Sequence, residues 1–254
     1  MWKGGFLMTQ LSHPYITIQN GQSISFGGNQ SWSRNLSGSG ARIAAYGCGA
    51  LTPPTAEIAA AKAADQDLYL RYLRGIEQKY ARVFPFFGMT GFELESGVNR
   101  YFNDYGICLR ARWLPVALNG PRAVQTAGQM LSKDLPVILS IPGAWLRSRA
   151  LPLYRLPPHS DAPAAHSDPE PLRYAGRGGH FVTVTALTRS GDGLPCFALS
   201  SWGKKYYLYL SDYARAARRA EGLLACGLLA LEPVSHPPRP LTIRISLPRS
   251  GQRD

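Results

Sequence analysis

The strongest constraint on the fold is a series of three strand-like segments in the second half of the chain. They are 180–187 (HFVTVTAL), 196–202 (CFALSSW) and 205–210 (KYYLYL), and all three are rich in β-branched and aromatic residues. Only short connections separate them, the first being a turn at Gly191-Asp192-Gly193. Since such short connections join neighbouring strands that run in opposite directions, we expect an antiparallel sheet.

The remaining elements are mostly helical and precede this sheet. Thr52 and Pro53 are typical of a helix start, and an Ala-rich run follows them. Helices are expected at 52–73, 91–110, 124–132 and 212–220, a strand at 136–141, and a hairpin at 15–26 around the Asn20-Gly21 turn. Residues 222–231 fit either a strand or a helix. Helices followed by strands indicate the α+β class.

The length favours a single domain. The chain has 254 residues, 45% of them hydrophobic, which is sufficient for one core. We expect this domain over residues 1–232, with a long Pro-rich loop at 147–178 and a basic Pro/Arg-rich tail, loosely ordered, at 233–254. No apolar run approaches the roughly 18 residues of a membrane-spanning helix, and we recognise no secretory signal, so we expect a soluble, cytoplasmic protein.

Charge and cysteine content exclude some classes of function. The formal net charge is +12, but the basic residues are dispersed and accompany no nucleic-acid-binding motif, so we expect solvated surface charge rather than nucleic-acid binding. The four cysteines form no C-x-x-C pair, and we expect neither a disulfide scaffold, nor a metal site, nor a cofactor. Cys108, Cys196 and Cys226 lie in apolar sequence and are expected in the core.

Three short segments could carry chemistry. Cys48 lies between two glycines just before the predicted helix at 52–73, where helix N–H groups stabilise a thiolate. His180 opens a buried strand directly after two glycines, and Ser200 precedes Ser201-Trp202-Gly203 at the end of the next strand. An imidazole beside a thiol forms a thiolate–imidazolium pair, which supplies a nucleophile and then a proton for the leaving group.

The order and spacing of these segments resemble those of the papain-like cysteine peptidase superfamily. The pieces Gly47-Cys48-Gly49, PVIL (136–139) and GHFVTVT (179–185) are most similar to the bacterial branch related to the bacteriocin-leader (double-glycine) peptidases, and the resemblance covers roughly residues 28–232. It implies a papain-like α+β fold, in which an N-terminal helical subdomain bearing the nucleophile Cys48 packs on an antiparallel sheet bearing the base His180. Ser200-Ser201-Trp202-Gly203 is similar to the Asn-Ser-Trp-Gly of papain, so the resemblance places Ser200 third in the triad.

The chain departs from this family at two positions. The family's oxyanion-binding glutamine usually lies close to the cysteine, whereas our candidate, Gln30, precedes Cys48 by 18 residues. The third member of the triad is normally Asn or Asp, and a Ser200 hydroxyl carries no charge to stabilise an imidazolium. Asp192, in the turn between the two strands, is the alternative third member.

Two main hypotheses for the function follow, beside a third, a basic nucleic-acid-associated protein, which would require binding with a steep salt dependence. The first is a thiol hydrolase, a cysteine peptidase or amidase, that acts on a peptide or protein through a Cys48 thioester, which water or an amine resolves. The loop at 147–178 would then cover the cleft or select substrates. The second is a catalytically impaired relative that serves as a peptide-binding module. The sequence does not indicate the substrate or the oligomeric state.

Overall fold

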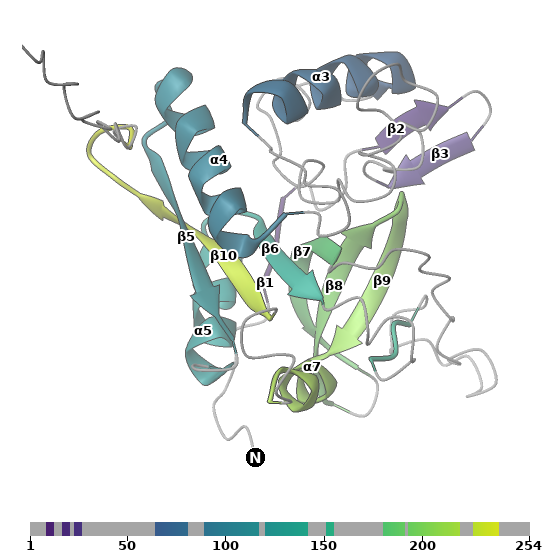
Figure 1. The fold of residues 1–254 in the computed structure, drawn as a ribbon. Coiled ribbons are helices and arrows are strands. Elements are labelled where there is room, and N and C mark those ends of the chain that lie inside the picture. Colours follow the sequence, from purple (N-terminus) through teal and green to yellow (C-terminus); the bar gives the residue numbers. More distant parts are fainter. Residues whose placement is uncertain are drawn as a thin grey trace, which may run out of the picture.

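The computed structural model describes residues 9–12, 17–20, 23–26, 64–80, 89–116, 120–141, 151–154, 180–190, 193–218 and 226–238. These residues form an α+β structure with an open antiparallel sheet and a second, smaller sheet. The class predicted from the sequence is therefore confirmed. Helices cover both faces of the large sheet (Figure 1).

The large sheet has seven strands, and every pair in it is antiparallel. Six strands lie in the order β5 (Leu109–Pro115), β10 (Gly227–Pro233), β6 (Val137–Ile141), β7 (His180–Arg189), β8 (Pro195–Ser201) and β9 (Lys204–Tyr209). The seventh, β1 (Thr9–Gln10), pairs with the part of β7 that extends past β6. The strands predicted at 136–141, 180–187, 196–202 and 205–210 are confirmed, and 222–231 contains a strand.

Four helices fall within the described ranges: α3 (Gln66–Lys79), α4 (Gly91–Asp104), α5 (Gly120–Leu131) and α7 (Leu210–Ala217). Side chains on alternate sides of the strands form two apolar clusters. Buried residues of α3 and α4 pack with Ile138, Phe181 and Leu229 on one face. Buried residues of α5 and α7 pack with Leu139 and Val182 on the other. Each strand of the sheet centre is therefore buried on both faces.

The smaller sheet contains the predicted hairpin, formed by β2 (Thr17–Asn20) and β3 (Ser23–Phe26). Its third strand is β4 (Ala64–Asp65), which runs parallel to β2. The helix predicted at 52–73 is corrected here, because Ala64 and Asp65 are extended and the helix begins at Gln66. Pairing with β2 outweighs the helical propensity of the Ala-rich run. Residues 52–63 lie outside the described residues.

The helix predicted at 91–110 is shorter than expected. Thr90 forms a capping box with Glu93 at its start. The helix ends at Asp104, and Gly106 follows with a φ of +65°. The sequence from Leu109 then forms β5, a strand that was not predicted, in which Ala111 and Trp113 are buried and Arg110 and Arg112 are exposed.

Helix α4 covers the outer edge of β5 with its side chains. The Asn99 side chain accepts from the Ala111 N–H at 2.8 Å and donates to the Ala111 carbonyl at 3.0 Å. The Glu95 carboxylate accepts from the Trp113 N–H at 2.7 Å. These groups take the place of a neighbouring strand, because they satisfy the backbone groups that an edge strand otherwise exposes.

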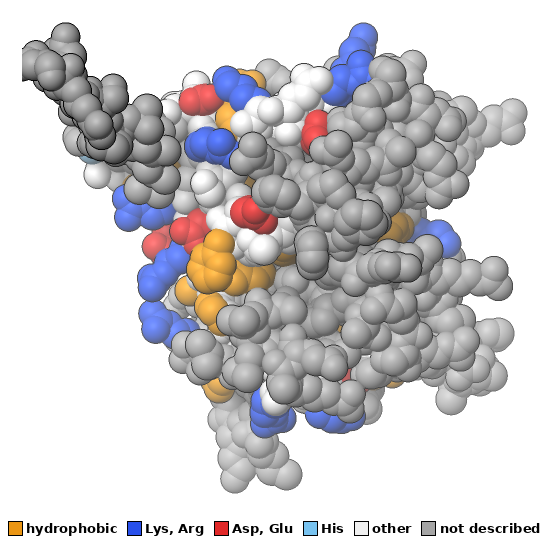
Figure 2. Space-filling model, in the orientation of Figure 1, with side chains coloured by type: hydrophobic (Ala, Val, Ile, Leu, Met, Phe, Trp, Pro, Cys, Tyr) orange, Lys and Arg blue, Asp and Glu red, His pale blue; other side chains and the backbone are white. Residues whose placement is uncertain are grey.

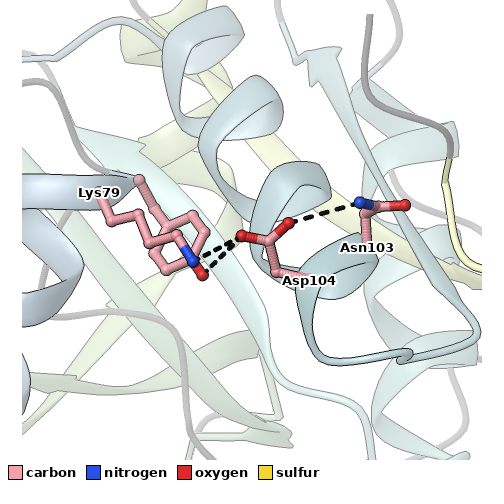
Figure 3. Close-up of polar contacts among 4 residues, drawn as sticks. Lys79, Asn103 and Asp104 are labelled. Carbon is pink, nitrogen blue, oxygen red and sulfur yellow. Dashed lines mark hydrogen bonds and ion pairs between the residues drawn. The ribbon is translucent and has the colours of Figure 1, made fainter.

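A polar contact joins α3 to α4. The Lys79 ammonium lies 2.9 Å from the Asp104 carboxylate, which also accepts from the Tyr80 hydroxyl at 2.9 Å and from Asn103 (Figure 3). The hydrogen bonds that Lys79 donates to Tyr80 and Asp104 raise the pKa of Lys79, and those that Asp104 accepts from Lys79 and Tyr80 lower the pKa of Asp104. Both charged groups are exposed, so solvent screens the pair and it aligns the helices more than it stabilises them.

Only residues 151–154 of the predicted loop at 147–178 are described, and they are docked on the sheet. Leu151 and Leu153 are buried in the cluster on the α5/α7 face. Tyr154 exchanges two backbone hydrogen bonds with Tyr207 of β9, at 3.0 and 2.8 Å. The rest of the predicted loop lies outside the described residues. Of the predicted tail, residues 233–238 are described, and the Val234 N–H donates to the Cys108 carbonyl.

Among the described helices, none combines the length and apolar character needed to cross a membrane.

Candidate functional site

His180 is the first residue of β7 and lies opposite Ile141 of β6. Its side chain is 3% exposed, although it stands at the end of a strand. Alternation along β7 places the imidazole on the same face as Val182, which belongs to the cluster that α5 and α7 cover. Helices α3 and α4 pack on the opposite face, with Phe181.

Two side chains hold the imidazole ring. His180 Nε2 lies 2.6 Å from the Oγ of Ser201, and both groups are buried. The indole of Trp202 stacks on the imidazole, with ring centroids 3.8 Å apart and an interplanar angle of 4°. Tyr206 contacts the same indole edge-on at 6.4 Å. The stack fixes the plane of the imidazole, and the Ser201 contact fixes its rotation within that plane.

The register of β7 and β8 explains why Ser201 is the residue that reaches His180. Ser200 lies directly opposite Thr183 and Leu199 opposite Val184. Because side chains alternate, Ser201 shares a face with Leu199, Val184 and His180, whereas Ser200 faces the other side with Thr183. The structure thus brings His180 together with the residue after the predicted Ser200. Alternation alone does not identify Ser201 from the sequence, because it also requires the register between the two strands.

The turn between β8 and β9 positions Trp202 through an unusual backbone conformation. Ser201 pairs with Lys204, so Trp202 and Gly203 form a two-residue connection. Both have positive φ values, 47° and 72°, as a type I′ turn requires. Asn-Gly is the favoured pair for this turn, and a bulky residue at positive φ is a genuine outlier. The strained residue is the one that covers the imidazole. Strained backbone conformations often occur at functional sites.

Burial determines the protonation state of this histidine. Desolvation disfavours the charged ring and lowers the pKa of His180 to about 3. The neighbouring Ser201 hydroxyl carries no charge to oppose that effect. The imidazole is therefore neutral at physiological pH unless an anion approaches it.

The other predicted site residues, Cys48, Gln30 and Asp192, lie outside the described residues. The structure therefore does not place the predicted nucleophile, the predicted oxyanion donor or the alternative third member of the triad. No group of three or more His, Cys, Asp or Glu side chains suited to a metal ion occurs among the residues that are described.

Two of the three cysteines predicted in the core are confirmed there. Cys196 and Cys226 are buried, whereas Cys108 is exposed and corrects the prediction. It lies in the connection between α4 and β5, two residues after Gly106. Burial raises the pKa of the Cys226 thiol to about 12, so this cysteine is unreactive in the folded state.

Comparison with known proteins found no match: no family model, no curated protein and no solved structure is similar to this chain. One face of the molecule shows described side chains of both charges. On the face drawn in Figure 2, Lys and Arg side chains of described residues are interspersed with Asp and Glu around a small apolar area.

Proposed function

We propose that the chain is a papain-like thiol hydrolase in which Cys48 is the nucleophile and His180 the base. The observation that carries this proposal is the contact between the buried His180 ring and Ser201 beneath the Trp202 indole. A histidine held by one nitrogen and stacked on one face has a fixed orientation, which proton transfer to a reacting group needs. With Nε2 engaged by Ser201, Nδ1 is the nitrogen that would exchange a proton with Cys48.

The electrostatics are compatible with a thiolate–imidazolium pair. Unit charges about 4 Å apart near a protein surface attract by about 4 kcal/mol, which corresponds to a pKa shift of about three units. Burial lowers the pKa of His180 from 6.5 to about 3, a shift of similar size and opposite sign. A Cys48 thiolate in contact with the ring would therefore return the pKa of His180 to near its ordinary value.

The proposed reaction is acyl transfer. The Cys48 sulfur attacks the substrate carbonyl, and the resulting oxyanion accepts hydrogen bonds from the Cys48 N–H and the Gln30 amide. The imidazolium of His180 gives its proton to the leaving amine as the carbonyl–nitrogen bond breaks, which leaves a thioester. His180 then takes a proton from water, or from a second amine, as that molecule attacks the thioester and releases Cys48.

A catalytically impaired peptide-binding module is the second candidate. The observation that favours it is the environment of His180: full burial and a neutral hydroxyl at Nε2 both disfavour an imidazolium. In this case Cys48 would be an ordinary thiol.

Reaction with iodoacetamide distinguishes these candidates, because only a thiolate is alkylated rapidly. Peptide mass spectrometry gives a separate rate for each cysteine, and the exposed Cys108 serves as an internal reference. The hydrolase proposal predicts that Cys48 reacts faster than Cys108 at pH 6–7, and that His180→Gln slows Cys48 about tenfold or more while Cys108 keeps its rate. Equal Cys48 rates in the wild type and His180→Gln would favour the binding module.

A further inference from the structure

One stretch of β7, residues 185–187, takes its neighbouring strand from far away in the sequence. β6 pairs with β7 only as far as Val184, and the residue that precedes β6 is Pro136, which has no N–H to continue the pairing. β1 pairs with the next part of the same side of β7, where Gln10 lies opposite Ala186. We call residues 185–187 the β7 edge, because without β1 their backbone groups on this side would face no described strand.

Three kinds of contact hold residues 9–12 against the β7 edge. The Leu11 N–H donates to the Thr185 carbonyl at 3.0 Å, and the Leu11 side chain is buried in the apolar cluster that α5 and α7 cover. The Asp134 carboxylate accepts from the N–H of Ser12 at 2.7 Å and from its hydroxyl at 2.5 Å. The place that β1 occupies therefore matches an extended backbone, an apolar side chain and a pair of hydrogen-bond donors.

Asp134 lies at a position that is unfavourable for a carboxylate. Its N–H donates to the carbonyl of Leu131, the last residue of α5, so it lies close to the negative end of the helix dipole. Its φ of 59° is also uncommon for a residue other than glycine. The two hydrogen bonds from Ser12 offset these costs and link the carboxylate to the docked segment.

The docked segment is not the best possible occupant of the β7 edge. Thr9 points to the same side of β1 as Leu11, and its hydroxyl oxygen is buried without a hydrogen-bond partner among the described residues. A buried hydroxyl that makes no hydrogen bond costs free energy, and a methyl group in its place would avoid that cost. Because β1 contains only two residues, this cost is large relative to the contacts that hold the segment.

We propose that the β7 edge is a docking site for an extended segment of a partner protein, and that residues 9–12 occupy it as a displaceable internal ligand. The partner segment adds a strand antiparallel to β7. It carries an apolar or β-branched residue at the place of Thr9, leucine at the place of Leu11, and serine or threonine at the place of Ser12. This binding activity does not depend on the proposed thiol hydrolase.

The probe is a synthetic N-acetylated peptide that copies residues 8–13 (MTQLSH) with Thr9→Val and carries fluorescein at its C-terminus. It is titrated into the full chain and followed by fluorescence anisotropy. We expect saturable binding below about 1 mM. A second peptide with Leu11→Ala in addition should bind more than about tenfold more weakly, because it lacks the apolar anchor. Absence of saturable binding, or equal binding of the two peptides, would overturn the inference.

The same substitution should have opposite effects in the peptide and in the protein. In the peptide, Thr9→Val should raise the affinity about tenfold over the unsubstituted copy, because it removes the unsatisfied hydroxyl. In the full chain, Thr9→Val strengthens the internal ligand, so the Thr9→Val peptide should bind about tenfold more weakly than it binds the wild type. A peptide bound elsewhere on the surface would not respond to the substitution in the protein, and that result would refute the proposal.

Hydrogen exchange measured by mass spectrometry locates the bound peptide. At saturation, the Leu11 amide should exchange faster, because it loses the Thr185 carbonyl, while the amides of β7 stay protected. Unchanged exchange at Leu11 would show that the internal segment has not been displaced, against the proposal. A concentration-dependent dimer of the protein alone, seen by size-exclusion chromatography and strengthened by Thr9→Val, would assign the edge to a second copy and overturn the partner protein.

Discussion

At the scale of single residues, Trp202 combines backbone strain with favourable packing. A positive φ costs a residue such as Trp about 1–2 kcal/mol. The half-buried indole packs against the core cluster and on His180, and burial of a large aromatic side chain is worth about 2–3 kcal/mol. Packing therefore outweighs strain at this position.

Replacing Trp202 tests that balance. Trp202→Asn creates the favoured Asn-Gly turn but removes the indole, so we expect a net loss of about 1–2 kcal/mol in the free energy of unfolding, measured in urea. Gly203→Ala is the matched control: it keeps the indole and strains a residue at φ 72°, which costs about 1 kcal/mol. A Trp202→Asn variant more stable than the wild type would show that the indole contributes little.

The lowered pKa of His180 predicts a pH-dependent stability. In Cys48→Ala, the unfolded chain protonates this histidine below pH 6.5, whereas the folded chain does not until about pH 3. The unfolded state therefore binds more protons in this window, and stability falls as the pH falls, by up to about 1.4 kcal/mol per pH unit.

The measurement is urea unfolding between pH 7 and pH 4 in Cys48→Ala and in Cys48→Ala/His180→Gln. The difference between the two slopes isolates His180. If Cys48 is the proposed nucleophile, the wild type should show a smaller His180 contribution, because its thiolate would raise the pKa of the ring. Identical slopes in the two variants would mean that burial does not depress this pKa.

Part of the site could be predicted at this scale and part could not. Sequence alone identified His180 and the segment 199–203 that meets it. It did not separate Ser200 from Ser201, because a motif carries no strand register, and a shift of one residue reverses the face of every side chain. The stack between Trp202 and His180 depends on a positive φ that hydrophobic pattern and composition do not reveal.

At the scale of elements, the edge of β5 depends on α4. Asn99→Leu removes both side-chain hydrogen bonds to Ala111 and leaves a part-buried N–H and C=O without them. We expect a loss of about 2–3 kcal/mol in the free energy of unfolding. Size-exclusion chromatography should also show self-association, since the exposed edge can pair with another chain.

Glu95→Gln is the control for this edge. Glutamine retains an oxygen that accepts from the Trp113 N–H, so this variant should lose less than about 1 kcal/mol and elute like the wild type. An Asn99→Leu variant with wild-type stability would show that the Asn99 contacts are dispensable.

The elements predicted correctly are those with strong local signals. The strands around 137–141 and 180–209 are rich in β-branched or aromatic residues, and the hairpin at 17–26 has its Asn-Gly turn. The failures are elements that distant partners determine. β4 is extended because it pairs with β2, and β5 because it pairs with β10, each far away in sequence.

At the scale of the whole molecule, the reactivity of buried cysteines reports whether the sheet and the helices packed on it unfold together. Cys226 is fully buried in the cluster that joins the sheet to α5 and α7, and its pKa is raised to about 12. In water it should react with iodoacetamide at least about a thousandfold more slowly than the exposed Cys108, because only unfolded molecules expose it.

Urea should accelerate alkylation of Cys226 in parallel with global unfolding followed by circular dichroism. Cys196 is buried between β7 and β9 and serves as a second reporter on the same sheet. Alkylation of Cys226 well below the urea midpoint, with Cys196 still protected, would show that the α5/α7 face opens separately.

Tyr154 and His180 are both fixed on one sheet, the first against its outermost strand β9 and the second at the head of β7. A peptide-bond break introduced anywhere in 155–179 would therefore give two fragments that each contribute strands to the same sheet. Those fragments would stay associated through inter-strand hydrogen bonds and shared apolar side chains. The imidazole would keep its contacts with Ser201 and Trp202 in such a nicked protein.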